Sequence, residues 1–474
     1  MIFHSIDYLL FFTGIICVYW ALNFRLQNTM LLLASYFFYG YVHAWYCILI
    51  GATTIVDYCC ARFIANKPKH KRLFLALSLT TNFSILCAFK YFGFFIENIV
   101  AVMGLVGLDM SGPTWEILLP VGISFYTFQS ASYVVDVYRG RVEARRKILD
   151  YALFVAFFPQ LVAGPIERAG RLLNALEKPR TFNPDRLRSG LFLMLWGLFK
   201  KLVIADNVAT ISNKALSIQD PSFPIVWGGV FAFCIQIYAD FSAYTDIARG
   251  TARTLGIDVC RNFNHPYIAR NPAAFWSRWH ISLSTWFRDY VYIPLGGNRC
   301  SEHRIIINIM LTFIVSGLWH GANWNFIIWG AYHGLLLVTW RLGCKIRPSI
   351  ENPSSRTVKL GQWIIMFGLI NIGWLIFREQ NPVYLWKFIT SSPLGISSEE
   401  WQTGLYFFAY SLILATPLAI HCWTDKWCTG DDHWESRQQN WKWVIAQSAL
   451  AGILLTAIFL LKSENSSEFI YFQF

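Results

Sequence analysis

Twelve stretches of the chain are apolar over roughly the length that a helix needs to cross a bilayer, about 20 residues, and short polar segments separate them. Two further segments, 149–166 and 273–296, are apolar but interrupted, and we expect them to be embedded without clearly crossing. The pattern predicts an all-α polytopic membrane protein with about 11–12 transmembrane helices plus re-entrant or interfacial helices. The predicted spans are 8–24, 29–42, 45–63, 73–97, 117–137, 189–206, 225–247, 304–319, 323–340, 359–377, 405–422 and 443–461.

The composition agrees with a membrane protein and excludes most soluble classes. Hydrophobic residues make up 55% of the 474 residues and charged residues 14%, whereas a soluble domain carries about 25% charged residues. Aromatic residues reach 17%, which is typical of chains with aromatic belts at the membrane surfaces. Collagen-like, disordered and disulfide-scaffold chains are excluded as well.

The charge distribution predicts the orientation of the spans. The net charge of +12 is concentrated in short loops, 67–72, 139–147, 168–188, 249–270 and 341–359, and the positive-inside rule assigns these loops to the cytoplasm. The loops near 104–114, 211–223 and 391–404 have no such excess. Counting the crossings between these loops predicts that both termini lie on the extracytoplasmic side.

Cysteine usage indicates neither a disulfide framework nor a metal site. The 11 cysteines are an odd number without a C-x-x-C pair, and several lie within apolar stretches, where small packing residues are common. One cluster combines histidine and cysteine, but its spacing matches no common zinc site. We therefore expect no bound metal. The cluster comprises His421, Cys422, Cys428 and His433.

The segment 276–290 is amphipathic at helical spacing. At 100° per residue, its aromatic residues fall on one side and its polar residues on the other, which predicts one helix in the cytoplasmic interface. His280 falls on the aromatic side, where it is partly dehydrated. This position is compatible with a structural histidine bonded to a neighbour and equally with a functional one.

The segment 317–326 joins two apolar spans and contains the strongest catalytic candidate, His320. An ionisable residue at membrane depth indicates function, and burial favours the neutral imidazole that a general base requires. The alternative is a histidine that caps a helix end. His333 is a weaker case, because its small neighbours are typical of helix packing.

Two other segments carry polar groups or breaks at membrane depth. Asp240 and Tyr244 lie one turn apart on a predicted span, with Asp246 near its cytoplasmic end. These groups either line a polar path or pair with Arg249. Prolines 159 and 165 are expected to break segment 149–166, either as a re-entrant turn or as a kinked helix.

The chain ends in an unusual tail. After the polar linker 462–468, the last six residues, 469–474, are apolar and aromatic, whereas a disordered tail is normally polar. Exposed aromatic residues of this kind favour a groove that receives them. A short interfacial anchor is the alternative.

With these residues assembled, the chain resembles the membrane-bound O-acyltransferase family, and within it the bacterial branch that O-acetylates exopolysaccharides such as alginate. The matching motifs extend from about residue 35 to 334. They include Ala163-Gly-Pro-Ile166, Asp240-Phe-Ser-Ala-Tyr-Thr-Asp-Ile-Ala248, Asn262-Phe-Asn-His-Pro-Tyr267, Arg278-Trp-His-Ile-Ser-Leu-Ser-Thr-Trp286, Ile293-Pro-Leu-Gly-Gly-Asn-Arg299 and Leu318-Trp-His-Gly-Ala322.

The resemblance implies a helical bundle around a central tunnel, formed by a single transmembrane domain over 1–461 and followed by an extracytoplasmic tail over 462–474. His320 is then the membrane-embedded catalytic histidine and His280 the second one. Tyr471, flanked by Phe469 and Phe474 in a Phe-x-Tyr-x-x-Phe pattern, is expected to take the acyl group as a relay.

The same resemblance implies the substrates and partners. Acetyl-CoA in the cytosol is the expected donor, and the residues expected to bind it are Arg270, Arg278, Arg288, Asp240 and Asn264. A serine-hydrolase-like (SGNH) acetyltransferase in the periplasm is expected to collect the acetyl group and place it on a polysaccharide. The expected location is the bacterial inner membrane.

Three alternatives stay open at this point. The first, within the same class, is transfer of D-alanine from a carrier protein to teichoic acid. The second, from another class, is a proton-coupled transporter or polysaccharide-export channel. Inverted repeats would support this alternative, and we find none in the sequence. A catalytically silent scaffold for an extracellular enzyme is the third.

Overall fold

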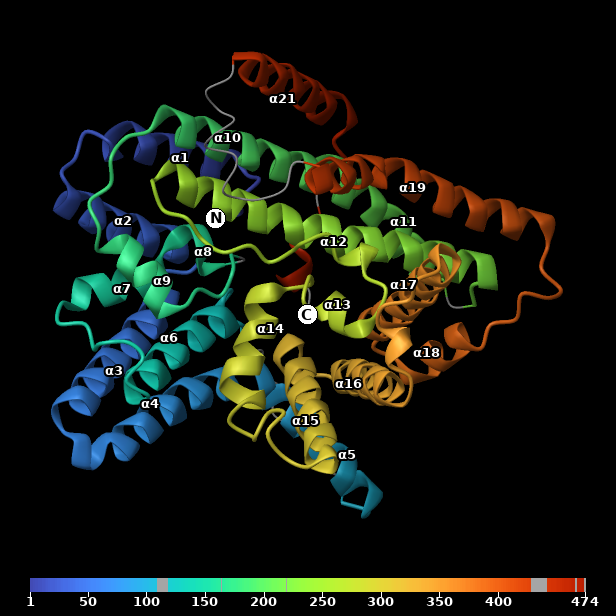
Figure 1. Cartoon of the computed structure of the whole chain (residues 1–474), viewed down its shortest axis with the longest axis horizontal. Coiled ribbons are helices and arrows are strands. Elements are labelled where there is room, and N and C mark those ends of the chain that lie inside the picture. Colours follow the sequence, from blue (N-terminus) through green and yellow to red (C-terminus); the bar gives the residue numbers. More distant parts are fainter. Residues whose placement is uncertain (109–117, 163, 219, 428–440, 465–466, 473–474) are drawn as a thin grey trace. The chain divides into compact units, whose positions relative to one another are not determined.

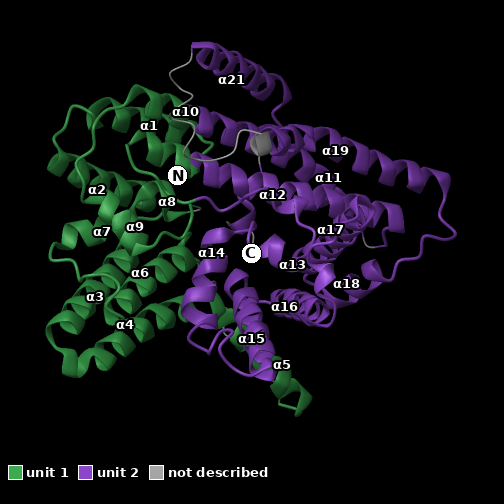
Figure 2. Ribbon diagram, viewed as in Figure 1, with its two compact units in different colours: residues 1–191, 248–260 green, residues 192–247, 261–474 purple. Residues whose placement is uncertain are grey.

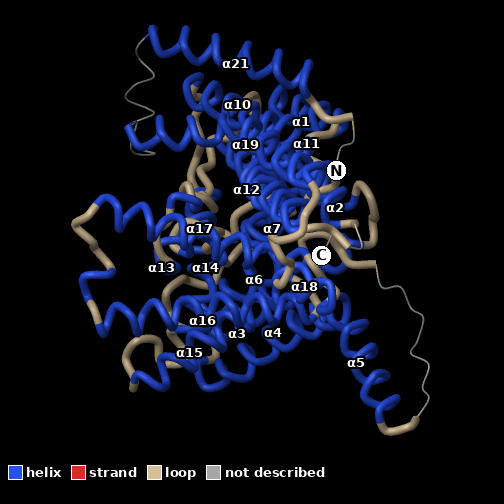
Figure 3. Tube along the Cα trace, turned by 90° about the vertical axis from the view of Figure 1, so that its right-hand side faces the viewer, coloured by secondary structure: helices blue, strands red, loops and turns tan. Residues whose placement is uncertain are grey.

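The described part of the chain is entirely helical. A computed structural model describes residues 1–108, 118–162, 164–218, 220–427, 441–464 and 467–472, and within these ranges it contains helices and loops but no strand (Figure 3). The predicted all-α membrane fold is therefore confirmed.

The helices follow one another along the chain as labelled in Figure 1. Their bounds are α1 Ile6–Tyr19, α2 Phe24–Gly40, α3 Tyr46–Asn66, α4 Lys71–Leu86, α5 Phe92–Leu105, α6 Ile123–Tyr138, α7 Ile148–Ala156, α8 Phe158–Leu161, α9 Ala169–Leu176, α10 Pro184–Phe199, α11 Asp206–Leu216, α12 Phe223–Thr254, α13 Pro272–Trp276, α14 Ile281–Phe287, α15 Glu302–His320, α16 Trp324–Ile346, α17 Arg356–Arg378, α18 Pro382–Ile389, α19 Ser398–Trp427 and α21 Trp441–Leu461.

Within the described residues, seven helical segments are long and apolar enough to cross a membrane. All seven coincide with predicted spans. Other predicted spans form shorter helices, such as α1 with 14 residues and α6 with 16, which are below the usual crossing length of about 20. The protein is thus a multi-pass membrane protein, and the number of 11–12 crossings stays a prediction. The seven segments are Tyr46–Asn66, Pro68–Leu105, Phe223–Thr254, Glu302–His320, Arg356–Arg378, Ser398–Thr424 and Trp441–Leu461.

The chain divides into two compact units (Figure 2). Unit 1 comprises Met1–Leu191 and Ala248–Cys260, and unit 2 comprises Phe192–Ile247 and Arg261–Phe474. Helices α10 and α12 contribute residues to both units.

In unit 1, a buried polar network joins α3, α4 and α6. The carboxylate of Asp57 accepts hydrogen bonds from Ser78 Oγ at 2.5 Å and from Asn82 Nδ2 at 2.8 Å. Ser130 Oγ on α6 donates to Asn82 Oδ1 at 3.3 Å. Because buried polar groups are costly when unpaired, the network fixes how these three helices pack.

The predicted break at the first of the two prolines is present in unit 1. Helix α7 ends at Ala156, and the short α8 begins at Phe158 with Pro159 in its first turn. Proline is tolerated there because the backbone N–H groups of a first helical turn have no partner within the helix. Ser35 Oγ accepts the Phe158 N–H at 3.0 Å, and Gln160 Nε2 donates to the Phe154 carbonyl at 3.3 Å. Side chains therefore satisfy the backbone groups that the break exposes.

In unit 2, α10 continues through a π-helical segment, η3 (Lys200–Ala205), directly into α11. This segment packs in an apolar core with residues of α12, α19 and α21. Such π segments widen a helix locally and are frequent at functional sites. Here it brings two consecutive lysines into the interior, Lys200 at 3% and Lys201 at 0% exposure.

Helices α15 and α16 of the same unit pack so closely that only glycine fits at their contact. A Cβ atom on Gly317 would lie 2.1 Å from the Phe326 carbonyl oxygen, and one on Gly330 would lie 2.3 Å from the Phe313 carbonyl oxygen. Small residues at such contacts let membrane helices approach through their backbones. The close approach fixes the end of α15, where His320 is the last helical residue.

We expect Gly330→Ala to lower the apparent melting temperature of the detergent-solubilised protein. Overpacking a close contact costs about 1–3 kcal/mol, more than the roughly 1 kcal/mol that alanine gains over glycine in a helix. Gly343→Ala on the same helix is the matched control, because its Cβ meets nothing within 4 Å, and we expect no loss there. Equal melting temperatures for the two variants would contradict the close-packing interpretation.

Candidate active site

His320 lies at the last position of α15, and it is the first component of a buried aromatic site in unit 2. Its side chain is 5% exposed, and its ring centroid lies 4.9 Å from that of Trp329 on α16 and 5.4 Å from that of Phe377 on α17. Gly321 follows, and a Cβ there would lie 2.1 Å from the Phe326 ring. The Phe326 ring therefore packs directly against the backbone after His320, and His320 is held at the helix end among aromatic rings.

His280 occupies a break between two helices, which corrects the prediction of one continuous helix over 276–290. Helix α13 ends at Trp276, and α14 begins at Ile281. His280 is the N-cap residue of α14 and has φ of 42°, a left-handed conformation that is uncommon outside glycine. The wheel pattern assumes an unbroken helix and cannot detect such a turn. His280 is fully buried rather than partly dehydrated, with 1% exposure.

The C-terminal tail enters this site and brings Tyr471 to both histidines. The ring centroid of Tyr471 lies 5.6 Å from that of His320 and 6.2 Å from that of His280. Trp319 contacts the same three rings, with centroids 5.0 Å from His320, 5.9 Å from His280 and 6.5 Å from Tyr471. All three residues expected from the sequence as catalytic are therefore neighbours in the fold.

The two tail residues directly before Tyr471 are buried rather than lying at a surface. Phe469 and Ile470 are 0% and 1% exposed. The Phe469 ring stacks obliquely on Tyr244 of α12 with centroids 4.0 Å apart, and Tyr471 lies 4.5 Å from the Phe241 ring. These residues are packed in the interior, so the surface-anchor alternative does not fit them. Phe474 of the predicted pattern lies outside the described residues.

Burial shifts the pKa values of Tyr471 and His280, which both lie outside the membrane-crossing helices. Burial raises the pKa of the Tyr471 phenol far above its ordinary value, and it lowers the pKa of His280 to about 3. The phenol therefore needs a base before it can act as a nucleophile, and His280 stays neutral at physiological pH.

A cavity of about 980 Å³ lies along α15. Its lining includes Glu302 in the first turn of α15, and Ser316, which lies one turn before His320 on the same face of that helix. The walls between these two ends are largely aromatic and aliphatic. Three cationic side chains line the cavity, Arg288, Arg341 and Lys345.

The structure brings only one of the predicted donor-binding arginines into the cavity lining. Arg288 lines it. Arg278 and Asn264 instead bond to each other: the Arg278 guanidinium donates to the Asn264 carbonyl at 3.0 Å, and the Asn264 N–H donates to the Arg278 carbonyl at 3.0 Å. Arg270 is half-buried and is not part of the cavity lining. Asp240 pairs with a lysine, as described next.

Lys201 and Asp206, which the sequence interpretation missed, are buried beside the tail. Lys201 Nζ lies 3.0 Å from Asp240 Oδ1, so Asp240 has Lys201 as an ion-pair partner. The signal was available in the sequence, because two adjacent lysines within the apolar stretch 189–206 are rare at membrane depth. Arg341 and Lys345 were likewise missed as cavity residues.

The remaining candidates show no catalytic arrangement. His333 is buried among Phe275, Trp276 and Trp329, with ring centroids 6.2, 5.1 and 4.9 Å away, which fits the packing interpretation. Of the histidine and cysteine cluster, Cys428 and His433 lie outside the described residues. The described ranges contain no group of three or more histidine, cysteine or acidic residues that could hold a metal ion.

Comparison with known proteins identifies a family and several similar chains. Residues 32–379 match the model of the membrane-bound O-acyltransferase family. The chain is 35% identical to a probable alginate O-acetylase of Pseudomonas putida, over 100% of both chains. It is 37% identical to a peptidoglycan O-acetyltransferase of Helicobacter pylori, over 76% of this chain and 73% of that protein. A teichoic acid D-alanyltransferase of Bacillus subtilis is 28% identical, over 56% of this chain and 70% of that protein.

Proposed function

The chain belongs to the membrane-bound O-acyltransferase family and is a membrane O-acetyltransferase, and on this premise we propose that it passes acetyl groups from cytosolic acetyl-CoA to Tyr471 of its own tail. The observation that carries the proposal is the position of the Tyr471 ring, 5.6 Å from His320 and 6.2 Å from His280 between ring centroids. As an enzyme, the chain is not the export channel considered above.

In the proposed step, His320 acts as the general base. Its imidazole takes the phenolic proton of Tyr471 while the phenolic oxygen attacks the thioester carbonyl, the new C–O ester bond forms and the C–S bond breaks. The proton on His320 then passes to the leaving CoA thiolate. We assign to the neutral His280 a hydrogen bond to the developing oxyanion. The surrounding rings exclude water, which protects the ester from hydrolysis.

The cavity along α15 suits acetyl-CoA. We propose that Arg288, Arg341 and Lys345 hold its phosphates, since cationic side chains pair strongly with phosphate. The uncharged pantetheine arm and acetyl group then follow the apolar walls toward Ser316 and His320. Arg341 and Lys345 belong to the loop 341–359, which the positive-inside rule assigns to the cytoplasm, and this agrees with a cytosolic donor.

On the outer side, the tail must hand the acetyl group to another enzyme. We propose that a serine-hydrolase-like acetyltransferase in the periplasm takes it and acetylates an envelope polysaccharide, with alginate and peptidoglycan the acceptors suggested by the relatives. This route requires the bacterial inner membrane and an extracytoplasmic tail. Acetyl is favoured over D-alanyl as the group transferred, because the acetyl-transferring relatives are more similar to the chain than the D-alanyl-transferring one.

The test is mass spectrometry of the C-terminal peptide. We expect the purified protein, incubated with acetyl-CoA and quenched in acid, to carry one acetyl group on Tyr471, and the same protein without acetyl-CoA to carry none. Cleavage after Glu468 releases the hexapeptide 469–474 for this measurement. An enzyme that transfers acetyl groups while its tail is never acetylated would overturn the relay. A D-alanyl group found on the tail of protein isolated from cells would establish the alternative donor.

A further inference from the structure

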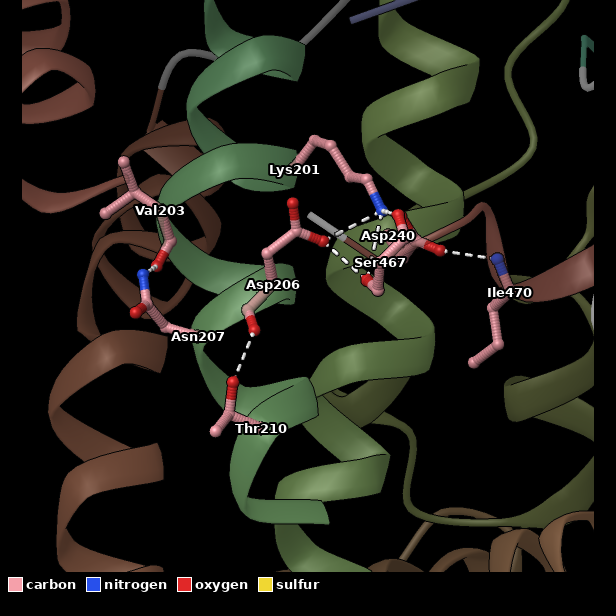
Figure 4. Close-up of polar contacts among 8 residues, drawn as sticks. All are labelled: Lys201, Val203, Asp206, Asn207, Thr210, Asp240, Ser467 and Ile470. Atoms are coloured by element: carbon pink, nitrogen blue, oxygen red, sulfur yellow. Dashed lines mark hydrogen bonds and ion pairs between the residues drawn. The ribbon is translucent and has the colours of Figure 1, made fainter. Parts of the chain in front are cut away.

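Three charged side chains are buried together beside the tail. Lys201, Asp206 and Asp240 are 0%, 1% and 1% exposed. Lys201 Nζ lies 2.9 Å from Asp206 Oδ1 and 3.0 Å from Asp240 Oδ1 (Figure 4). Two carboxylates share one ammonium group, so the cluster carries an excess negative charge in a position where charge is costly to bury. Further hydrogen-bond donors are needed to stabilise it.

The tail supplies those donors. The Ile470 N–H donates to Asp240 Oδ2 at 2.7 Å, and the Ser467 hydroxyl donates to Asp206 Oδ1 at 2.6 Å. Lys201 in turn donates to the Ser467 carbonyl oxygen at 2.7 Å (Figure 4). Each of the three charged groups therefore makes at least one charge-assisted hydrogen bond with the tail, and the bonds to the Ile470 N–H and the Ser467 carbonyl involve main-chain atoms.

We propose that Lys201, Asp206 and Asp240 form a clamp that seats the tail by its backbone and sets the register of Tyr471 at the histidines. The three are positioning residues, and the proposal rests on the acetyl relay described above. Ile470 directly precedes Tyr471, so the clamp holds the chain at the residue next to the proposed nucleophile. A slip of one residue moves the tyrosine by about 2–3.5 Å, and misplacement by 1 Å is enough to reduce a reaction severely.

Packing around the clamp supports this assignment. Phe469, between the two clamped residues, stacks on Tyr244, and Lys201 Nζ lies 5.8 Å above the same Tyr244 ring. Upstream, the Ser463 N–H donates to the Leu202 carbonyl at 3.2 Å, and Asn207 Nδ2 donates to the Leu461 carbonyl at 2.9 Å. Leu461, Ser463 and Ser467 therefore all contact the same short helical segment, 201–207.

The first test changes the tail and leaves the helices intact. Ile470→Pro removes the N–H that Asp240 accepts, and Ile470→Ala keeps that N–H while removing most of the side chain. Proline is tolerated in the first turn of a helix, and residue 470 begins the short 3-10 turn η7 (Ile470–Phe472). The readout is cleavage of the 468–469 bond by a glutamate-specific protease in the detergent-solubilised full chain, measured as release of hexapeptide 469–474. Each rate is divided by that of the same chain unfolded, which corrects for the intrinsic effect of proline.

We expect the seated tail to resist cleavage. We expect Ile470→Pro to be cut at least about 10-fold faster than Ile470→Ala, because it loses one charge-assisted hydrogen bond. Equal corrected rates for these two variants would overturn the clamp.

The second test changes the protein side. Lys201→Met removes the clamp cation, and Lys200→Met is the matched control, because Lys200 is the adjacent buried lysine and bonds to Ser242 and Asp246 instead of the tail. We expect rapid cleavage in Lys201→Met and resistance in Lys200→Met. A protected tail in folded Lys201→Met would contradict the proposal. If Lys201→Met does not fold, the tail variants decide.

The two proposals fail separately. If the tail is released in Ile470→Pro while the protein still transfers acetyl groups at the normal rate, the result supports the clamp and overturns the relay through Tyr471. A tail that stays protected in Ile470→Pro overturns the clamp, whatever the transfer rate.

Discussion

Replacing His320 by alanine is expected to abolish acetyl transfer while the protein stays folded in the membrane. A positioned general base contributes about 10²–10⁴-fold to a rate, and the phenol of Tyr471 has a pKa raised by burial, so it loses its proton poorly without one. The measurement is the rate of tail acetylation from acetyl-CoA in detergent, followed by mass spectrometry. We expect a decrease of at least about 100-fold.

The matched control for this variant is His303→Ala. His303 lies in the first turn of the same helix, α15, is exposed, and does not line the cavity. We expect normal transfer from it. Size-exclusion profiles and melting temperatures of both variants separate loss of chemistry from loss of folding. Normal transfer by folded His320→Ala would remove His320 from the mechanism.

Tyr471→Phe is expected to stop transfer to the outside without releasing the tail. The substitution keeps the ring that packs 4.5 Å from Phe241 and 5.6 Å from His320, and it deletes only the hydroxyl that would form the ester. The measurements are acetyl content of the extracellular or envelope polysaccharide in cells, and resistance of the 468–469 bond to protease. We expect acetylation to fall to the level of cells lacking the protein, with the tail still resistant.

The control for the second prediction is Tyr406→Phe, which deletes an exposed tyrosine hydroxyl on α19. We expect full acetylation from it. Unchanged polysaccharide acetylation in Tyr471→Phe cells would mean that another hydroxyl accepts the acetyl group and that the tail has a structural role only.

Local sequence patterns predicted the helices of this protein better than they predicted the contacts between the helices. Apolar stretches of crossing length identified helices such as α3, α12 and α15, because a lipid environment requires each helix to satisfy its own backbone. Pro159 marked a real break for an equally local reason, since proline lacks the N–H of a helix interior. The same reasoning failed at His280, where the backbone takes a positive φ that no side-chain pattern encodes.

The site itself was predictable in part. His320 and Tyr471 each stood out as residues whose chemistry does not suit their surroundings, an ionisable ring at membrane depth and an aromatic terminus after a polar linker. Lys201 did not stand out as a partner for either, because its contacts to Asp240 and Ser467 join residues 39 and 266 positions apart. Arg278 was expected to meet a phosphate on the basis of charge alone, and its neighbour in the fold is the Asn264 carbonyl.

The tail is covalently continuous with α21, and this connection has a kinetic consequence on the proposed route. The tether keeps Tyr471 at a local concentration in the millimolar range, so no diffusing carrier has to be captured for each cycle. It also gives every molecule a single acceptor hydroxyl. With donor in excess and nothing outside to unload the ester, the enzyme would therefore stop after a burst of one acetyl group per polypeptide, and the amplitude of that burst would count the competent molecules.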